Sequence, residues 1–260
     1  MKKFVPVFCV PVMMALAICC PGCGGDKIFA AAMSPAISWG LSPNTRQEVP
    51  PAPDGVETLL KEYGGLYVSD TDEKKVFFTF DLGYEAGYTD EVLDILKEHN
   101  IKAVFFLCGL YLKQADLVAR MLAEGHQIGN HTDRHKDLPT LAKEGITTDI
   151  MTFQNDFAAQ YPTSPAPVFM RPPKGRFDEK TLQIAKDNNL RTMLWSIAIV
   201  DWGKTAIDAK SNAAKITSRI HPGAILLLHI TNSGTPQMLK LLIPQILDKG
   251  YEIGSPGEII

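Results

Sequence analysis

The feature that most constrains the fold is a regular alternation of short apolar runs with longer segments of helical character, which begins after Lys75. The apolar runs are continuous, a pattern typical of parallel strands that are buried on both faces. The segments between them repeat apolar residues at helical spacing, as at Ile146, Ile150 and Phe153. Alternating strands and helices therefore predict a parallel sheet with helices packed on its faces.

About seven strand–helix units can be counted, so we expect an α/β barrel of the TIM type that is incomplete or distorted. The expected strands are residues 76–80, 103–107, 126–129, 168–170, 192–197, 224–228 and 251–253. The expected helices are residues 89–99, 115–124, 144–160, 178–187, 206–219 and 236–250.

The chain is expected to have two extensions before this barrel domain, which spans residues 73–260. Residues 33–72 are rich in proline, glycine and polar side chains and predict an extended arm with one short helix near residues 56–63. Residues 1–32 predict a signal peptide or an N-terminal anchor, because two lysines precede a long apolar run and small residues follow it. We therefore expect an exported protein of the cell envelope or the extracellular space.

The cysteines and the net charge limit the partners. Cys19, Cys20 and Cys23 suggest a lipoprotein, but none follows the usual Leu-x-Gly/Ala context, so that alternative is the weaker one. Beyond residue 32 only Cys108 remains, so no internal disulfide is expected. With a formal net charge of −3 and no long basic run, we expect no nucleic-acid partner, membrane contact only through the leader, and a monomer.

Two histidines, His131 and His135, lie four residues apart directly after an expected strand. If the chain is helical there, both imidazoles share one face and can reach one divalent metal ion. The alternative is a pair of unrelated surface histidines, and the spacing alone does not decide between the two.

The decisive pattern is that ionisable side chains follow five of the expected strands. A barrel places its chemistry at the carboxyl ends of its strands. Each of these residues alone could be a turn or capping residue, but five together predict an active site. They are Asp81, the pair His131 and His135, Arg171, Asp201 and His229.

These residue types suit the attack of water on a carbonyl, which needs a base, a group that stabilises the oxyanion, and an acid. We assign Asp81 as the base, held ionised by Arg171, and His229 as the acid, oriented by Asp201. A backbone N–H near Lys174 is the candidate oxyanion donor. Glu85 and Tyr88 are candidates to line the substrate cleft, and a purely structural role suits them as well.

The ordered motifs resemble those of the polysaccharide deacetylases, carbohydrate esterase family four. The resemblance covers residues 75–250, and its motifs are Thr79-Phe80-Asp81, His131-Thr132-Asp133-Arg134-His135, Arg171-Pro172-Pro173-Lys174-Gly175, Asp201-Trp202 and Leu227-Leu228-His229. It implies a distorted (β/α)7 barrel, hydrolysis of an N-acetyl group on a glycan, His131 and His135 as metal ligands, and Trp202 and Leu227 as walls of the acetyl pocket.

A longer run, residues 79–89, is similar to the subfamily that deacetylates N-acetylmuramic acid during spore-cortex assembly. That similarity implies a peptidoglycan glycan strand as the substrate and muramic δ-lactam as the end product. Three alternatives stay open: a catalytically inactive glycan-binding protein, an N-acetylglucosamine deacetylase, and a glycosidase that uses Asp81 and Asp201 as its carboxylate pair.

One position departs from the family pattern. The family usually has a second aspartate directly after the base, as the third metal ligand, and this chain has Leu82. Two histidines bind a divalent ion more weakly than a full set of three ligands does. The need for a metal ion therefore stays open at this point, and so does the identity of the ion.

Overall fold

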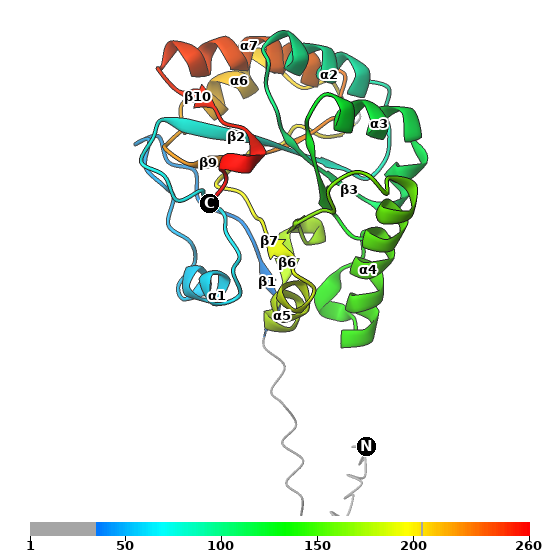
Figure 1. Cartoon of the computed structure of the whole chain (residues 1–260). Coiled ribbons are helices and arrows are strands. Elements are labelled where there is room, and N and C mark those ends of the chain that lie inside the picture. Colours follow the sequence, from blue (N-terminus) through cyan, green and yellow to red (C-terminus); the bar gives the residue numbers. More distant parts are fainter. Residues whose placement is uncertain (1–34, 204) are drawn as a thin grey trace, which may run out of the picture. The chain divides into compact units, whose positions relative to one another are not determined.

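The structure is a computed structural model that describes residues 35–203 and 205–260. Its centre is an eight-stranded sheet whose strands pair in parallel (Figure 1). The strands are β2 (Lys75–Leu82), β3 (Val104–Leu107), β4 (Gln127–Asn130), β5 (Phe169–Met170), β7 (Arg191–Thr192), β8 (Ile197–Ala198), β9 (Ala224–His229) and β10 (Glu252–Ile253). Their order is β7-β5-β4-β3-β2-β9-β8, and β10 pairs with β2.

Helices follow most of these strands and cover the outside of the curled sheet (Figure 1). They are α2 (Thr89–Glu98), α3 (Ala115–Ala123), α4 (Lys143–Gln160), α5 (Glu179–Asp187), α6 (Ala209–Thr217) and α7 (Thr235–Asp248). Short 3₁₀ helices are η1 (Gly109–Lys113), η2 (Leu138–Thr140), η3 (Pro173–Gly175) and η4 (Pro256–Glu258). The predicted α/β fold, a distorted barrel, is confirmed.

The central strand β2 shows how the sheet separates core from site. Phe78, Phe80 and Leu82 belong to the large core between the sheet and its helices. Phe77 belongs to a smaller cluster inside the barrel. Because side chains alternate along a strand, Asp81 faces the same side as Phe77. The even-numbered side chains of β2 therefore pack in the large core. The odd-numbered ones face the barrel interior, with Asp81 at its open end.

The barrel is incomplete on one side, where the sequence predicted a single strand over residues 192–197. The structure corrects this prediction: β7 and β8 lie at opposite edges of the sheet, joined by residues 193–196. The Met193 N–H donates to Met170 of β5, whereas the Ser196 N–H donates to Ile225 of β9. Within three residues the chain thus changes from pairing with β5 to pairing with β9, and residues 193–196 run across the open side of the barrel.

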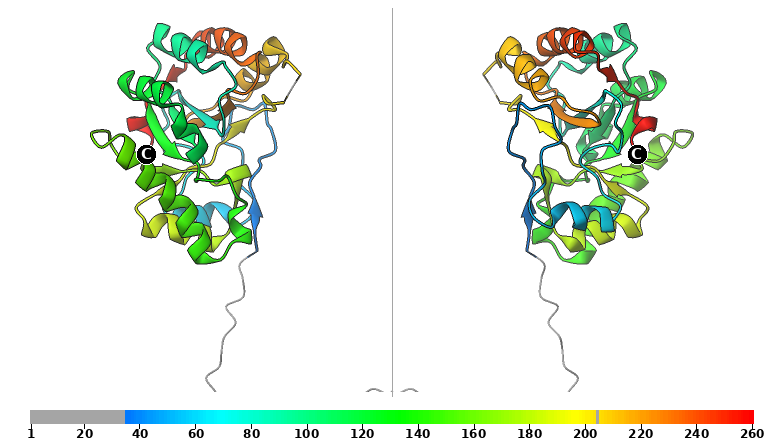
Figure 2. Two further views of the ribbon diagram at one scale, coloured as in Figure 1. Left: turned by 90° about the vertical axis from the view of Figure 1, so that its right-hand side faces the viewer. Right: turned by 90° about the vertical axis from the view of Figure 1, so that its left-hand side faces the viewer.

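The arm covers this flank of the barrel (Figure 2). Its first strand, β1 (Ile37–Ser38), pairs antiparallel with β6 (Arg176–Phe177), and its short helix α1 (Val56–Glu62) lies where one was expected. Trp39 is buried, and its indole N–H donates to the Trp195 carbonyl over 2.9 Å. The described part of the arm belongs to the same compact unit as the barrel.

Acidic side chains set the start of two helices, and one of these helices begins three residues later than predicted. Helix α2 begins at Thr89 as predicted, and the Glu85 carboxylate accepts the N–H groups of Tyr88 and Thr89 at its start. The helix predicted from residue 206 begins at Ala209, because the Asp208 carboxylate caps it by accepting the N–H of Ser211.

The predicted leader, residues 1–32, lies outside the described residues. From residue 35 onward, leaving out residue 204, the structure contains no helix with the length and apolar character that crossing a bilayer requires.

One buried histidine predicts a pH-dependent stability. His126 accepts the Ala103 N–H through Nδ1, and burial lowers its pKa from 6.5 to about 4. Since the folded state disfavours the protonated form, the free energy of unfolding should fall by about 3 kcal/mol as the pH drops from 6.5 to 4. His126→Asn keeps an acceptor without titrating, so denaturant unfolding should show a smaller decline. Parallel declines in wild type and variant contradict this account, and exposed His99→Asn is the control.

Candidate active site

The base and acid predicted from the sequence lie side by side at the open end of the barrel. Asp81 and His229 are partners in the register of the adjacent parallel strands β2 and β9. Neighbouring strands lie about 4.8 Å apart, so the two side chains leave the sheet as direct neighbours. Both line one cavity of about 490 Å³, together with His131 and His135.

Arg171, at the end of β5, is fully buried inside the barrel, and all its donor nitrogens are used. One terminal nitrogen donates to the Asp81 carboxylate over 2.7 Å and to the Thr79 hydroxyl over 2.9 Å. The other two nitrogens donate to the carbonyls of Met193 and Leu194, each over 3.0 Å. These bonds offset the desolvation of the guanidinium and fix its plane.

The barrel interior is shaped to hold this guanidinium. Its central carbon lies 4.1 Å from the centre of the Phe106 ring. That ring needs the room left by Gly129, where an added Cβ would come within 2.5 Å of the ring. The glycine before the histidine motif therefore makes space for the aromatic side chain against which Arg171 packs.

The buried Asp81 carboxylate is held ionised. Burial alone raises the pKa of Asp81, but the adjacent Arg171, through its charge and its hydrogen bond, is the main opposing influence, and the pKa is lowered overall. An ionised carboxylate at the mouth of the barrel is available to accept a proton near neutral pH.

The two motif histidines share the cavity, but helical spacing is not the reason. Residues 131–135 form a loop in which Thr132 and His135 adopt left-handed backbone angles, with φ of 66° and 52°. The Thr132 hydroxyl accepts the His135 N–H over 3.1 Å and closes this loop. The imidazole rings lie 5.0 Å apart at 69°. The chain is thus not helical here, so that assumption was wrong, but the two imidazoles lie close together as expected.

The histidine pair suits a divalent cation as part of a mixed donor set. The Nδ1 of His131 donates to the Arg171 carbonyl over 2.8 Å, which leaves Nε2 unprotonated 3.6 Å from the Asp81 carboxylate. Burial lowers the pKa of His131 to about 4 and also lowers that of His135, so both rings are neutral near pH 7. Neutral imidazoles beside a carboxylate are donors that a transition metal accepts.

The set of side chains that could bind a metal ion is nevertheless small. Among residues 35–203 and 205–260, no three His, Cys, Asp or Glu side chains group as a metal site. Leu82 is fully buried in the core between sheet and helices and supplies no donor. Cys108 is buried too, and its thiol donates to the His131 carbonyl. The residues present thus fit an ion that keeps several ligand positions for water or substrate.

The end of β9 supplies a histidine that is hydrogen-bonded to an aspartate. The Nδ1 of His229 lies 2.8 Å from one Asp201 oxygen, and the His229 backbone N–H donates to the other oxygen over 2.7 Å. Burial alone lowers the pKa of His229, but the Asp201 carboxylate outweighs it and raises that pKa above its usual value. Asp201 itself is fully buried. The arrangement fixes the ring and keeps Nε2 free as a proton donor.

Large exposed side chains surround the cavity, and most of them were not predicted from the sequence. Tyr84, Leu110 and Trp202 are 56%, 55% and 59% exposed, and all three line it. Only Trp202 was predicted. Tyr84 lies three residues after Asp81, but nothing in the sequence shows that its ring turns outward, and Leu110 comes from η1 after β3.

Three predicted binding residues lie away from this lining. Tyr88 packs against the main core, and the neighbouring Glu85 caps α2, so the cleft predicted for both is corrected to a structural role. Leu227 is buried on β9, two residues before His229 and therefore on the same face. Lys174 adopts a left-handed turn with φ of 59°, and its charge contributes to lowering the pKa of His135.

Comparison with known proteins identifies the family to which the chain belongs. Residues 68–193 match the family model described as "Polysaccharide deacetylase". The chain is 33% identical over 262 residues to the peptidoglycan-N-acetylmuramic acid deacetylase PdaA of Bacillus subtilis, covering 100% of this chain and 96% of that relative. The chain belongs to the polysaccharide deacetylase family. It is accordingly a hydrolase that acts on amide bonds.

Two further comparisons place this deacetylase within the family. The solved structure of PdaA, a family 4 carbohydrate esterase, superposes with a TM-score of 0.80 at 33% identity, covering 86% of this chain and 96% of that one. A peptidoglycan-N-acetylglucosamine deacetylase of Bacillus cereus is 33% identical over 198 residues, covering 74% of this chain and 70% of that relative. Relatives named for either peptidoglycan sugar are thus similar to it.

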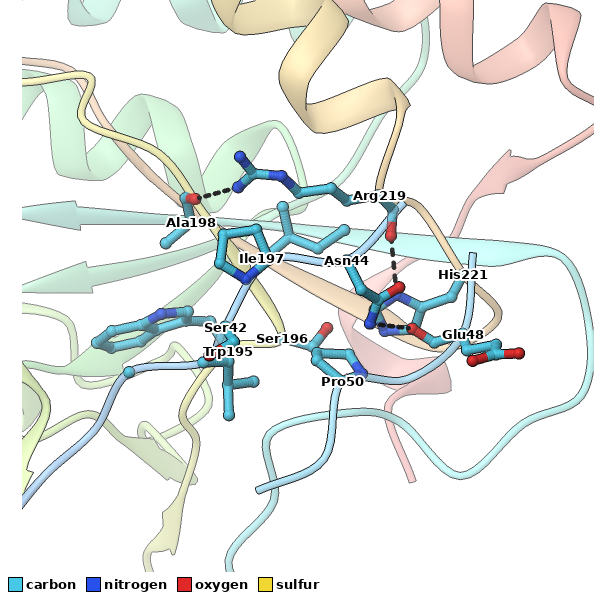
Figure 3. Close-up of a pocket in the computed structure, with 13 residues that line it drawn as sticks. Ser42, Asn44, Glu48, Pro50, Trp195, Ser196, Ile197, Ala198, Arg219 and His221 are labelled. Atoms are coloured by element: carbon cyan, nitrogen blue, oxygen red, sulfur yellow. Dashed lines mark hydrogen bonds between the residues drawn. The ribbon is translucent and has the colours of Figure 1, made fainter. Parts of the chain in front are cut away.

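The deacetylase has a second cavity, of about 240 Å³, between the arm and the chain crossing at residues 195–198 (Figure 3). Arg219 donates to the Ala198 carbonyl over 3.3 Å, and the buried His221 ring bonds the Arg219 carbonyl over 3.0 Å. Asn44 also lines the cavity and donates to the Glu48 carbonyl. None of the predicted site residues lines this cavity, so we assign the chemistry to the first one.

Proposed function

We propose that the protein is an exported peptidoglycan de-N-acetylase that hydrolyses the N-acetyl group of N-acetylmuramic acid. The observation that carries the proposal is the placement of Asp81 and His229 as register partners in one cavity, beside a pair of neutral imidazoles. The similarity over the full length to a relative named for this sugar supports the choice of substrate.

In the proposed reaction Asp81 acts as general base. It removes a proton from water as the water oxygen attacks the carbonyl carbon of the acetamido group, and Arg171 keeps its carboxylate ionised and oriented. The tetrahedral intermediate collapses with cleavage of the carbon–nitrogen bond. His229 gives its proton to the leaving nitrogen, so the products are acetate and a free amine. Asp201 stabilises the imidazolium that supplies this proton.

The walls of the site also have proposed roles. Trp202 and, deeper on β9, Leu227 enclose the acetyl methyl group, and the backbone N–H at Lys174 donates to the oxyanion. His131 and His135 would hold a divalent ion, which supplies Lewis-acid polarisation of the carbonyl when bound. The freed amine of muramic acid then attacks the lactyl carboxylate of the same sugar. Loss of water gives muramic δ-lactam, the form used in spore cortex.

Metal dependence gives a direct prediction. Exhaustive chelation should lower amine release at least about tenfold, and adding a divalent ion back should restore it, because a ligand set without a third protein donor loses its ion readily. The measurement is amine release from purified glycan before chelation, after it, and after titration with several ions. His135→Ala, which removes one of the two imidazoles, is expected to respond less to added ion. Undiminished turnover after chelation, with no gain on adding metal, contradicts the proposal.

The pH profile gives a second prediction. Because His229 must be protonated to act as the acid, kcat/KM should fall as the pH rises through its raised pKa. Asp201→Asn removes the charge that raises this pKa, so the alkaline limb of the profile should move to lower pH. Asp208→Asn, a change at the cap of α6, is the control and should leave the limb in place. An unshifted limb in Asp201→Asn rules out the proposed role of this pair.

Mass analysis of muropeptides after digestion with the purified protein tests the function itself. We expect muramic acid to lose one acetyl group, and its δ-lactam to appear. Loss of acetyl from glucosamine instead makes the protein an N-acetylglucosamine deacetylase. New reducing ends without amine indicate a glycosidase, and unchanged glycan indicates a binding protein. N-terminal sequencing of the protein secreted by its host tests export, with cleavage expected near residue 32.

A further inference from the structure

The loop that carries both histidines is held from outside the cavity, by helix α4. The Asp133 N–H donates to the backbone carbonyl of Asp149 over 2.9 Å. The next N–H, that of Arg134, donates to the Asp149 carboxylate over 3.2 Å. One residue of α4 thus accepts both N–H groups at the centre of the loop.

The strand end before the loop is bound to the same helix, α4. The Asn130 side chain donates to the Ile150 carbonyl over 2.9 Å and to Gln154 over 3.2 Å. Its oxygen accepts the Thr132 N–H over 2.8 Å. Asn130 is fully buried, as is the Thr132 side chain that receives the His135 N–H. The four N–H groups from Thr132 to His135 therefore all have fixed acceptors.

This anchoring is needed because the loop is strained. Thr132 and His135 both have positive φ, which residues with a Cβ adopt only when their surroundings enforce it. Relaxation of either residue would turn the imidazole of His135 away from that of His131. The Asp149 side chain is 5% exposed and uses only one oxygen; the other has no hydrogen-bond partner in residues 35–203 or 205–260.

We propose that Asp149 is a positioning residue that holds the loop between His131 and His135 in the conformation that binds a cation. This inference rests on the proposed metal role of the two histidines. Asp149 touches neither ring and acts only through the backbone of Asp133 and Arg134. Because a single carboxylate oxygen accepts the Arg134 N–H, the oxygen of an amide in the same place should replace it, whereas alanine offers no side-chain acceptor.

The first test is binding of Zn²⁺ to the full chain, measured by calorimetry without substrate. Asp149→Ala should weaken binding by about 10–100-fold, the usual effect of losing a residue that orients metal ligands. Asp149→Asn should stay within a few-fold of wild type, since its amide oxygen still accepts from Arg134. Asp156→Ala is the matched control: the same substitution on the same helix, two turns later, at an exposed residue.

The second test needs no metal, and its first arm uses the wild-type protein alone. In wild-type protein, the N–H groups of Asp133 and Arg134 should exchange with deuterium slowly, although their loop lies at the rim of the barrel. In Asp149→Ala the exchange should become fast at Arg134, whose N–H loses its side-chain acceptor, and should change less at Asp133, whose acceptor is the backbone carbonyl of residue 149, while that of β2 stays slow. Fast exchange in wild type, or equal Zn²⁺ affinity in Asp149→Ala and wild type, overturns the proposal. Slow exchange without any Zn²⁺ binding by wild type contradicts the metal role of the histidines and leaves Asp149 a purely structural residue.

Discussion

Asp81→Asn is expected to lower amine release from peptidoglycan by about 10²- to 10⁴-fold, the contribution usual for a general base. Asparagine cannot take the proton from water, but it retains an oxygen that accepts from Arg171. The buried guanidinium therefore keeps a partner, and the fold should survive. Alanine is a poorer choice, because a buried charge left without its partner costs about 3–5 kcal/mol.

The measurement is amine release by wild type and Asp81→Asn at equal concentration of folded protein, checked by thermal unfolding. Asp94→Asn, which makes the same chemical change at an exposed residue of α2, is the control and should be fully active. A variant that retains more than about a tenth of wild-type turnover would show that a group other than Asp81 accepts the proton.

His229→Ala is the second large effect, with an expected loss of turnover of about two to four orders of magnitude. The ring provides the proton for the leaving nitrogen, which without it would have to leave as a strongly basic amide anion instead of a neutral amine. KM should change much less, because the proton is needed only as the carbon–nitrogen bond breaks. The exposed His99→Ala should behave as wild type.

A double variant sharpens this prediction. Asp201 touches the site through His229 alone in our account, so adding Asp201→Asn to His229→Ala should cost nothing more. Steady-state kinetics of the two single variants and the double variant measure this. A loss of only a few-fold in His229→Ala, or additive losses in the double variant, means that the acid has been assigned wrongly.

Much of the site could be predicted because strand ends are visible in the sequence. The runs before Asp81, Arg171 and His229 are apolar and continuous, and parallel strands bring their carboxyl ends to one edge of a sheet. Periodicity does not show which strands are neighbours. The register that makes Asp81 and His229 partners is a long-range property that only the folded chain reveals.

Where sequence analysis failed, long-range contacts override local patterns. Residues 192–197 look like one strand, yet hydrogen bonds to two different strands split them into β7 and β8. The spacing of His131 and His135 suggests a helical turn, yet buried Asn130 and Asp149 hold a loop with positive φ. Tyr88 looks available for substrate, yet the cap formed by Glu85 turns this segment onto the core.

The central claim is that a single cavity brings one carboxylate and one imidazole to the same acetamido group. A crystal structure of Asp81→Asn with a bound N-acetylmuramic acid oligosaccharide tests it most directly. We expect the acetamido group to lie between residue 81 and His229, with its nitrogen facing the Nε2 of His229. An acetamido group bound elsewhere, with no sugar atom in contact with either residue, would contradict the account.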